Sequence, residues 1–109
     1  MGRHTVQATC YDKRGRKISV AINSYSVTHP MQAHFARLAG IAEKEFLHAE
    51  VRALLRAKDR KVHSVHIERY HKDGSPALAK PCPACALALA AFGVHNVTYT
   101  EELDSRIDL

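Results

Sequence analysis

The feature that most constrains the fold is a change in the spacing of the apolar residues along the chain. In segments 5–11 and 17–24 they alternate with polar residues, which is the period of a half-buried strand. From Leu47 they recur every three or four residues, which is the period of one face of a helix. The sequence therefore predicts an α/β domain in which helices pack against a sheet.

The two alternating segments predict a β-hairpin. The polar stretch 12–16 between them contains Gly15 and suits a turn. The residues expected to face the interior are Val6, Ala8 and Cys10 on the first strand, and Ile18, Val20 and Ile22 on the second.

Helices and strands are expected to alternate after the hairpin. A short helix is predicted over 30–38, with Pro30 at its start and Gly40 at its end. The longer elements are a helix from Leu47 into the basic run 56–61, a strand over 62–70, a helix over 82–92 closed by Gly93, and a strand over 94–100. Apart from the short helix, the order is β-β-α-β-α-β, and the crossovers place the last strands parallel.

Length and composition narrow the class of protein. A chain of 109 residues suits a single domain over 1–109. The longest apolar run, Ala84 to Val94, is too short to cross a bilayer, and the N-terminal segment has no signal-peptide core. We therefore expect no membrane segment and a cytoplasmic protein. A net charge of +5 favours anionic partners such as nucleotides or nucleic acid.

Two clusters carry residue types that bind metal ions, at the starts of two predicted helices. His48 lies in one, and Cys82 and Cys85 lie in the other. The thiols are three residues apart, so both point to one side of a helix start, where thiolates are favoured. A Cys-x-x-Cys pair alone could be a redox couple or half of a structural zinc site. With His48 as third ligand and Cys10 expected in the core, an open fourth position remains, as in catalytic zinc sites.

Glu50 has a different expected role. Residues two apart do not share a helix face, so His48 and Glu50 can meet only at the end of the helix. There Glu50 would stand beside the metal as a proton carrier rather than a ligand.

The two clusters together, His48-Ala49-Glu50 followed by Pro81-Cys82-Pro83-Ala84-Cys85, resemble the signature of the zinc-dependent cytidine and deoxycytidylate deaminase superfamily. The stretches 23–30 and 47–51 are similar to small deaminase-like proteins of bacteriophages and bacteria. The resemblance covers nearly the whole chain and implies a three-layer cytidine deaminase-like fold around a mixed sheet. The family's sheet usually has five strands, and four are expected here, so the last helix and strand are missing or replaced by an oligomeric partner.

The resemblance implies zinc-dependent hydrolysis of a cytosine base to uracil with release of ammonia. Zn²⁺ held by His48, Cys82 and Cys85 would lower the pKa of a bound water and generate hydroxide. Glu50 would take the proton of this water, pass it to the ring nitrogen and then protonate the departing ammonia.

Five further residues are candidates for substrate contacts. The resemblance implies that the amide of Ala49 and the backbone at Pro81 orient the base, and that Asn23 contacts the sugar. Tyr25 and His29 are candidates to stack on a base or to border the pocket. Asn23 could instead be a turn residue at a strand end, and Tyr25 and His29 could be surface loop residues.

Three functions remain open. The first is deamination of a free nucleoside or nucleotide such as deoxycytidine or deoxycytidine monophosphate, favoured because aromatic residues, the usual stacking platforms for a strand, make up only 6% of the chain. The second is deamination of cytosine or adenosine in single-stranded DNA or RNA, as in toxin-like members of the superfamily. The third is a non-catalytic zinc-binding module, for which Glu50 would have no use.

The basic residues and the small size of the chain suggest two kinds of partner, a phosphate-containing molecule and further copies of the chain. The cations around the hairpin turn and in segment 52–61 could meet phosphate, although a run of charges is more often a solvated face. A homo-oligomer is expected, because so small a domain with a short sheet has reason to associate.

Overall fold

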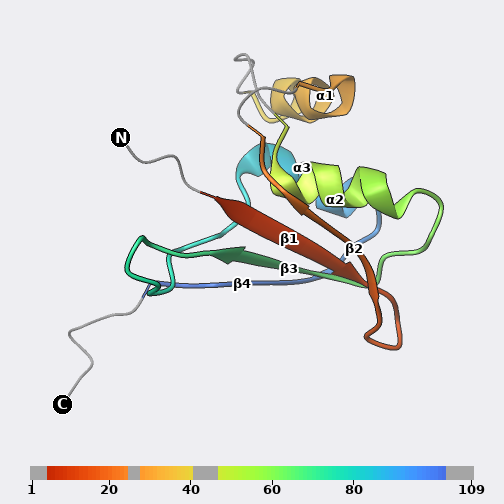
Figure 1. Ribbon diagram of the computed structural model, residues 1–109. Coiled ribbons are helices and arrows are strands. Elements are labelled where there is room, and N and C mark those ends of the chain that lie inside the picture. Colours follow the sequence, from red (N-terminus) through yellow and green to blue (C-terminus); the bar gives the residue numbers. More distant parts are fainter. Residues whose placement is uncertain (1–4, 25–27, 41–46, 103–109) are drawn as a thin grey trace.

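A computed structural model describes residues 5–24, 28–40 and 47–102 of the chain (Figure 1). The elements in chain order are β1 (Val6–Tyr11), β2 (Lys17–Ile22), α1 (Pro30–Leu38), α2 (Ala49–Ala57), β3 (Ser64–Arg69), α3 (Pro83–Ala91) and β4 (Asn96–Tyr99). Every element that the sequence predicts is present, with boundaries that differ by a few residues at most.

The four strands form one mixed sheet in the order β2-β1-β3-β4. Strand β1 pairs antiparallel with β2 and with β3, and β3 pairs parallel with β4 across the α3 connection. The α/β class and the parallel final pair are therefore confirmed.

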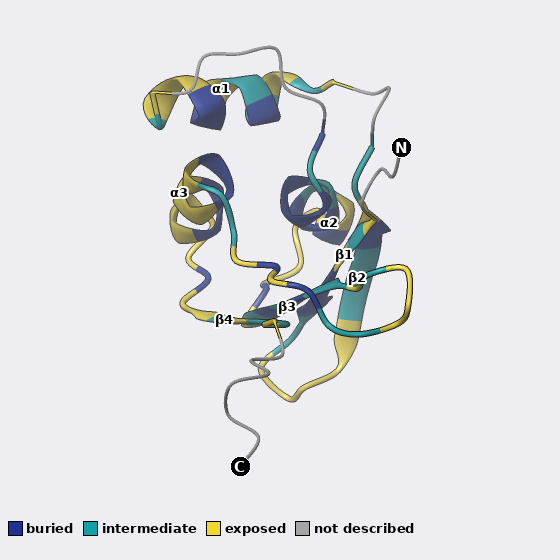
Figure 2. Ribbon diagram, turned by 90° about the vertical axis from the view of Figure 1, so that its left-hand side faces the viewer, coloured by how far each residue is buried: buried dark blue, intermediate teal, exposed yellow. Residues whose placement is uncertain are grey.

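The elements are stacked in layers above one face of the sheet (Figures 1 and 2). Helix α2 packs against β1 and β2, α3 lies beside α2, and α1 packs on α3 on the side away from the sheet. In the part of the chain that the structure describes, no helix covers the opposite face of the sheet. None of the described helices is long and apolar enough to span a bilayer.

The buried face of the sheet is set by the strand register. Ala8 lies opposite Ala21 and Ile67, and Cys10 lies opposite Ser19 and Val65. Apart from Ser19, which is half-buried, these side chains are almost fully buried beneath the helices, so the expected core position of Cys10 is confirmed.

The expected inward face of β2 is wrong. Ser19 and Ala21 face α2, and the Ser19 hydroxyl donates a hydrogen bond to the carbonyl of Ala53 at 2.8 Å. Ile22 is 48% exposed, and of the expected inward set on this strand only Ile18 packs partly against the core. The physical reason is that the alternation in β2 is ambiguous, since Ala21 is also apolar, and the position of α2 decides which face is covered.

The helix ends follow the glycine and proline signals. Gly40 and Gly93 have φ values of +78° and +76°, as expected for residues that end a helix in the left-handed conformation. Helix α2 begins at Ala49 with His48 as its N-cap, and α3 begins at Pro83 with Cys82 as its N-cap. Both predicted ligand clusters therefore lie at helix starts.

Candidate metal centre

The sheet topology brings the two helix starts together. Strands β2 and β3 are both antiparallel to β1, so both run toward the end of the sheet at which β1 begins. Helix α2 is reached from the end of β2 and α3 from the end of β3, so both helices begin at that same end (Figure 1). His48 and Cys82, 34 residues apart in the sequence, become neighbours for this reason.

The three predicted metal ligands converge. The Nδ1 atom of His48 lies 3.3 Å from Sγ of Cys85 and 3.6 Å from Sγ of Cys82. All three potential ligand atoms lie within 4.8 Å of one another. Tetrahedral zinc with Zn–S near 2.3 Å and Zn–N near 2.0 Å holds its nitrogen and sulfur ligands about 3.6 Å apart. The spacing of the ligand atoms therefore fits a single zinc ion.

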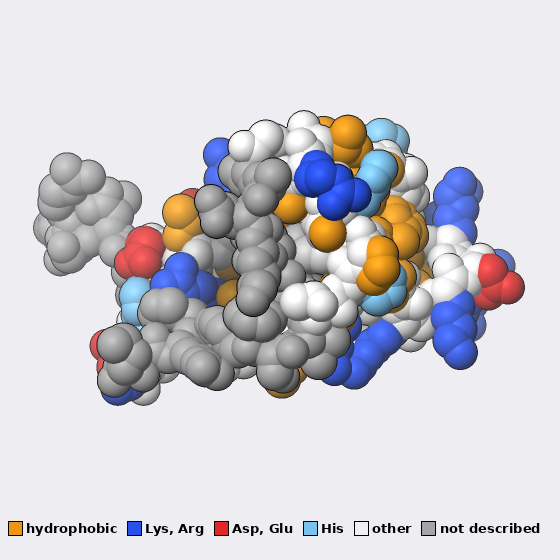
Figure 3. Space-filling model, turned by 90° about the horizontal axis from the view of Figure 1, so that it is seen from above, with side chains coloured by type: hydrophobic (Ala, Val, Ile, Leu, Met, Phe, Trp, Pro, Cys, Tyr) orange, Lys and Arg blue, Asp and Glu red, His pale blue; other side chains and the backbone are white. Residues whose placement is uncertain are grey.

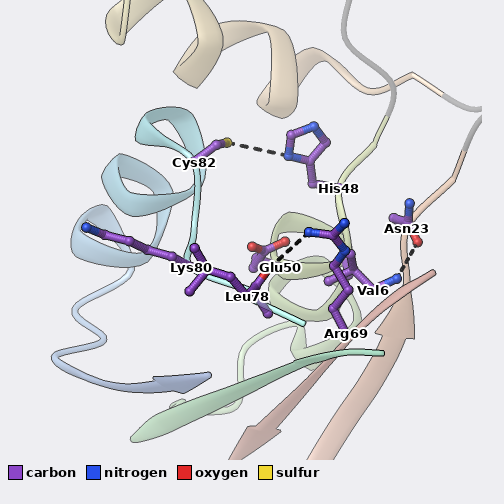
Figure 4. A pocket seen from close by; sticks show the side chains of 10 residues that line it. Val6, Asn23, His48, Glu50, Arg69, Leu78, Lys80 and Cys82 are labelled. Atoms are coloured by element: carbon purple, nitrogen blue, oxygen red, sulfur yellow. Dashed lines mark hydrogen bonds between the residues drawn. The ribbon is translucent and has the colours of Figure 1, made fainter. Parts of the chain in front are cut away.

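Neither N-cap residue uses its side chain to cap its helix. The imidazole of His48 and the thiol of Cys82 point toward each other instead (Figure 4). Both helices also direct the positive end of their dipole toward the cluster, which stabilises thiolate ligands.

The two cysteines share one proton. The hydrogen bond from the Cys85 thiol lowers the pKa of Cys82 to about 4, with a further contribution from His48, although partial burial acts in the opposite direction. The same hydrogen bond and burial raise the pKa of Cys85. The lowered pKa favours the thiolate form of Cys82, which accepts a hydrogen bond from the Cys85 thiol. A metal ion binding to both sulfurs must displace the proton of Cys85.

Glu50 lies in the first turn of α2 beside the cluster and is only 6% exposed. Burial raises the pKa of its carboxyl, while its backbone hydrogen bond, His48 and the Cys85 side chain oppose that shift. A carboxyl with a raised pKa at a cavity wall is suited to taking up and releasing a proton near neutral pH.

A cavity of about 220 Å³ opens beside the ligand cluster (Figure 4). Of the residues predicted for the site, those that line it are Asn23, His48, Ala49, Glu50 and Cys82. The remaining lining residues, which the sequence analysis does not single out, are Val6, Arg69, Leu78, Ala79 and Lys80.

Of the other predicted substrate contacts, His29 and Pro81 do not line this cavity, and Asn23 lines it but has a second role. The Oδ1 atom of Asn23 accepts the backbone N–H of Val6 at 2.9 Å, so this residue has a strand-end role as well as a place in the cavity. His29 is the N-cap of α1, where its Nδ1 accepts the N–H of Met31 at 3.0 Å, and it does not line the cavity. Pro81 lines a separate groove along α3 and β4. Tyr25 lies outside the described residues.

Gln32 on α1 is a site residue that the sequence analysis misses. Its side chain is 0% exposed, and its Oε1 accepts the backbone N–H of His48 at 3.1 Å. Its amide also lies against Cys85 and lowers the pKa of that thiol, although Nε2 has no well-aligned hydrogen-bond acceptor among the described residues. Gln32 lies three and four residues before Phe35 and Ala36, so helical spacing places all three on the buried face of α1. This spacing indicates that Gln32 is buried, but not that it contacts the ligand cluster.

Arg69, the last residue of β3, is the second missed residue. Its Nη1 donates to the carbonyl of Leu78 at 3.1 Å, and its Nε is buried without a hydrogen-bond partner among the described residues. Its guanidinium group lies between Glu50 and Asn23 at the cavity (Figure 4). No local sequence signal marks Arg69, because charged residues at strand ends are common.

Comparisons of the chain with protein-family models, with curated proteins and with solved structures found no match. The interpretation of the site therefore depends on its own residues. These are three nitrogen and sulfur ligand atoms, a buried carboxyl and a cavity beside them.

Proposed function

We propose that the protein is a zinc-dependent hydrolase that deaminates a cytosine base of a free nucleotide, with a fold similar to that of the cytidine and deoxycytidylate deaminases. The observation that carries the proposal is the convergence of His48, Cys82 and Cys85 beside the buried Glu50 at one cavity. Both ligand clusters occupy helix starts that lie at the same end of the sheet.

The ligand set favours zinc over other common ions. Two thiolates and an imidazole are the ligands that zinc prefers, whereas magnesium and calcium prefer oxygen atoms. Among the described residues the group contains three ligands, and the third cysteine, Cys10, is 0% exposed beneath the helices. Three protein ligands leave a fourth coordination position for water or substrate, which is typical of catalytic zinc.

The proposed chemistry divides between the ion and Glu50. Zinc in such a site lowers the pKa of water and supplies a nucleophile near neutral pH. Glu50 accepts the proton released from that water and holds it in a buried environment that favours the protonated carboxyl. It then delivers this proton to the ring nitrogen, and as the C–N bond breaks it passes the proton of the newly added hydroxyl to the amino group, which leaves as ammonia.

Arg69 supports a substrate that carries a negative charge. The guanidinium group of Arg69 lines the cavity beside Glu50. Arg binds phosphate through charge-assisted hydrogen bonds, so a phosphate group of a substrate in the cavity would meet a cationic donor there. This favours a nucleotide such as deoxycytidine monophosphate over the uncharged nucleoside.

The test is ammonia release by the zinc-loaded protein. The substrates are deoxycytidine, deoxycytidine monophosphate, the corresponding adenine compounds and an oligonucleotide with one cytosine. We expect turnover of deoxycytidine monophosphate and little or none of the oligonucleotide. Ammonia release from none of these substrates would contradict the proposal.

A matched pair of variants tests the role of Glu50. Glu50→Gln removes the proton carrier and should lower kcat by about 10²–10⁴-fold while one zinc ion per chain stays bound. Glu101→Gln makes the same change at an exposed position and should leave kcat unchanged. Activity that persists in Glu50→Gln would contradict the assigned role.

A further inference from the structure

A second hollow, of about 450 Å³, lies at the opposite end of the molecule from the metal centre. It is formed by the hairpin turn between β1 and β2 and by the segment that follows α2, both of which lie at the far end of the sheet (Figure 1). Its lining residues are Asp12, Lys13, Arg14, Arg16, Ile18, Arg60, Lys61 and His63. We call this hollow the basic groove.

The basic groove has a large excess of positive charge. Five of its lining residues are Lys or Arg and one is an Asp. The carboxylate of Asp12 is already engaged, because it accepts the backbone N–H groups of Arg14 and Arg16 at 2.9 Å and forms an ion pair with the Arg16 side chain at 3.6 Å. The other four cationic side chains have no salt bridge within the part of the chain that the structure describes: Lys13, Arg14, Arg60 and Lys61.

The two sides of the groove are fixed relative to each other. The hairpin turn is closed by hydrogen bonds from Asp12 N–H to the Arg16 carbonyl at 2.8 Å and from Gly15 N–H to the Asp12 carbonyl at 2.9 Å. The backbone N–H of His63 donates to the carbonyl of Tyr11 at 2.8 Å and so ties the second segment to the hairpin. The cations therefore converge on a supported framework rather than on two independent loops.

Two of the residues that line the basic groove carry no formal charge. They are Ile18, which is half-buried, and the exposed His63, whose Nε2 lies 3.3 Å from Nδ2 of Asn96. Figure 3 shows several Lys and Arg side chains at the end of the molecule where the hairpin turn lies, and others elsewhere on this face. Grooves that bind single strands without sequence preference follow the phosphate backbone with cations, and this groove supplies those cations without Phe, Tyr or Trp platforms for the bases.

We propose that the basic groove binds the phosphate backbone of a single-stranded nucleic acid. Backbone contacts are electrostatic and carry no sequence information, so binding depends on salt and little on sequence. With about four phosphates neutralised, the slope of log K against log salt concentration for a single strand is about −3. The site needs neither the metal nor turnover, so its test is independent of the deaminase proposal.

The experiment is fluorescence anisotropy with the full-length protein and a labelled single-stranded oligonucleotide over a range of salt concentrations. Arg14→Gln/Arg60→Gln removes one cation from each side of the groove. We expect it to weaken binding about tenfold or more at low salt and to reduce the salt slope by about half. The matched control, Arg37→Gln/Lys72→Gln, removes the same charge from exposed positions outside the groove and should change affinity less than about twofold.

Two competitors distinguish nucleic acid from polyanions in general. Unlabelled oligonucleotide should displace the probe at a much lower concentration than tripolyphosphate or a nucleoside triphosphate. Equal competition at equal phosphate concentration would overturn the assignment to a nucleic-acid strand. Equal losses in the two double variants, or no binding by the unmodified protein at low salt, would overturn the site itself.

Discussion

Replacement of Gln32 by Met tests whether this buried amide supports the metal centre. The substitution keeps a side chain of similar size but removes the acceptor of the His48 N–H and the amide beside Cys85. A typical hydrogen bond contributes about 0.5–1.5 kcal/mol, so loss of this part-buried one should lower the free energy of unfolding of the metal-free protein by about that amount. Loss of a group that orients metal ligands lowers metal affinity about 10–100-fold, so the zinc Kd should rise accordingly.

Two measurements separate these effects. Urea unfolding in the presence of a chelator gives the stability, and competition with a chromophoric chelator gives the zinc Kd. Gln7→Met, at an exposed position on β1, is the control and should leave both unchanged. A Gln32→Met protein that loses stability but keeps the zinc Kd would show that Gln32 only packs, and would refute the argument that it positions the ligands.

Three further predictions follow from strain, charge and protonation. Lys58 has φ 57° and ψ −123°, a backbone conformation that glycine adopts more readily than other residues. Lys58→Gly should therefore raise the free energy of unfolding by about 1 kcal/mol. A lower free energy of unfolding in urea would contradict this. Arg69→Gln should lower kcat/KM about 10–100-fold for deoxycytidine monophosphate but under about threefold for deoxycytidine, and equal effects would contradict the phosphate contact. Zinc displaces a proton from Cys85 but not from Cys82, whose pKa is lowered to about 4. Zinc affinity should therefore rise about tenfold per pH unit between about pH 6 and 8. An affinity that calorimetry finds independent of pH would contradict the shared proton.

The fold could be predicted where local signals are strong. The two-residue alternation gave the hairpin, and Gly40 and Gly93 marked helix ends that the structure confirms through their positive φ values. The buried face of β2 could not be predicted in the same way. Ile18, Val20 and Ile22 outweigh Ala21 in hydrophobicity, but α2 packs on the side of the strand that carries Ala21. Which face is covered depends on tertiary packing, and a local pattern does not contain that information.

Some residues of the candidate site could likewise be predicted from the sequence, and others could not. The pairing of Cys82 and Cys85 on one side of a helix start could be predicted from their spacing, whereas their approach to His48, which the sequence motif indicated, depends on the sheet topology. Gln32 and Arg69 could not be assigned, since they reach the site from α1 and from the end of β3 through contacts between distant segments.

X-ray absorption spectroscopy of the zinc-loaded protein tests the metal centre most directly. The proposed site predicts one zinc per chain, with two sulfur atoms near 2.3 Å and one nitrogen and one oxygen near 2.0 Å. A shell of three or four sulfur atoms, or a protein that takes up no zinc, would contradict a centre formed by His48, Cys82 and Cys85 with a position open to water.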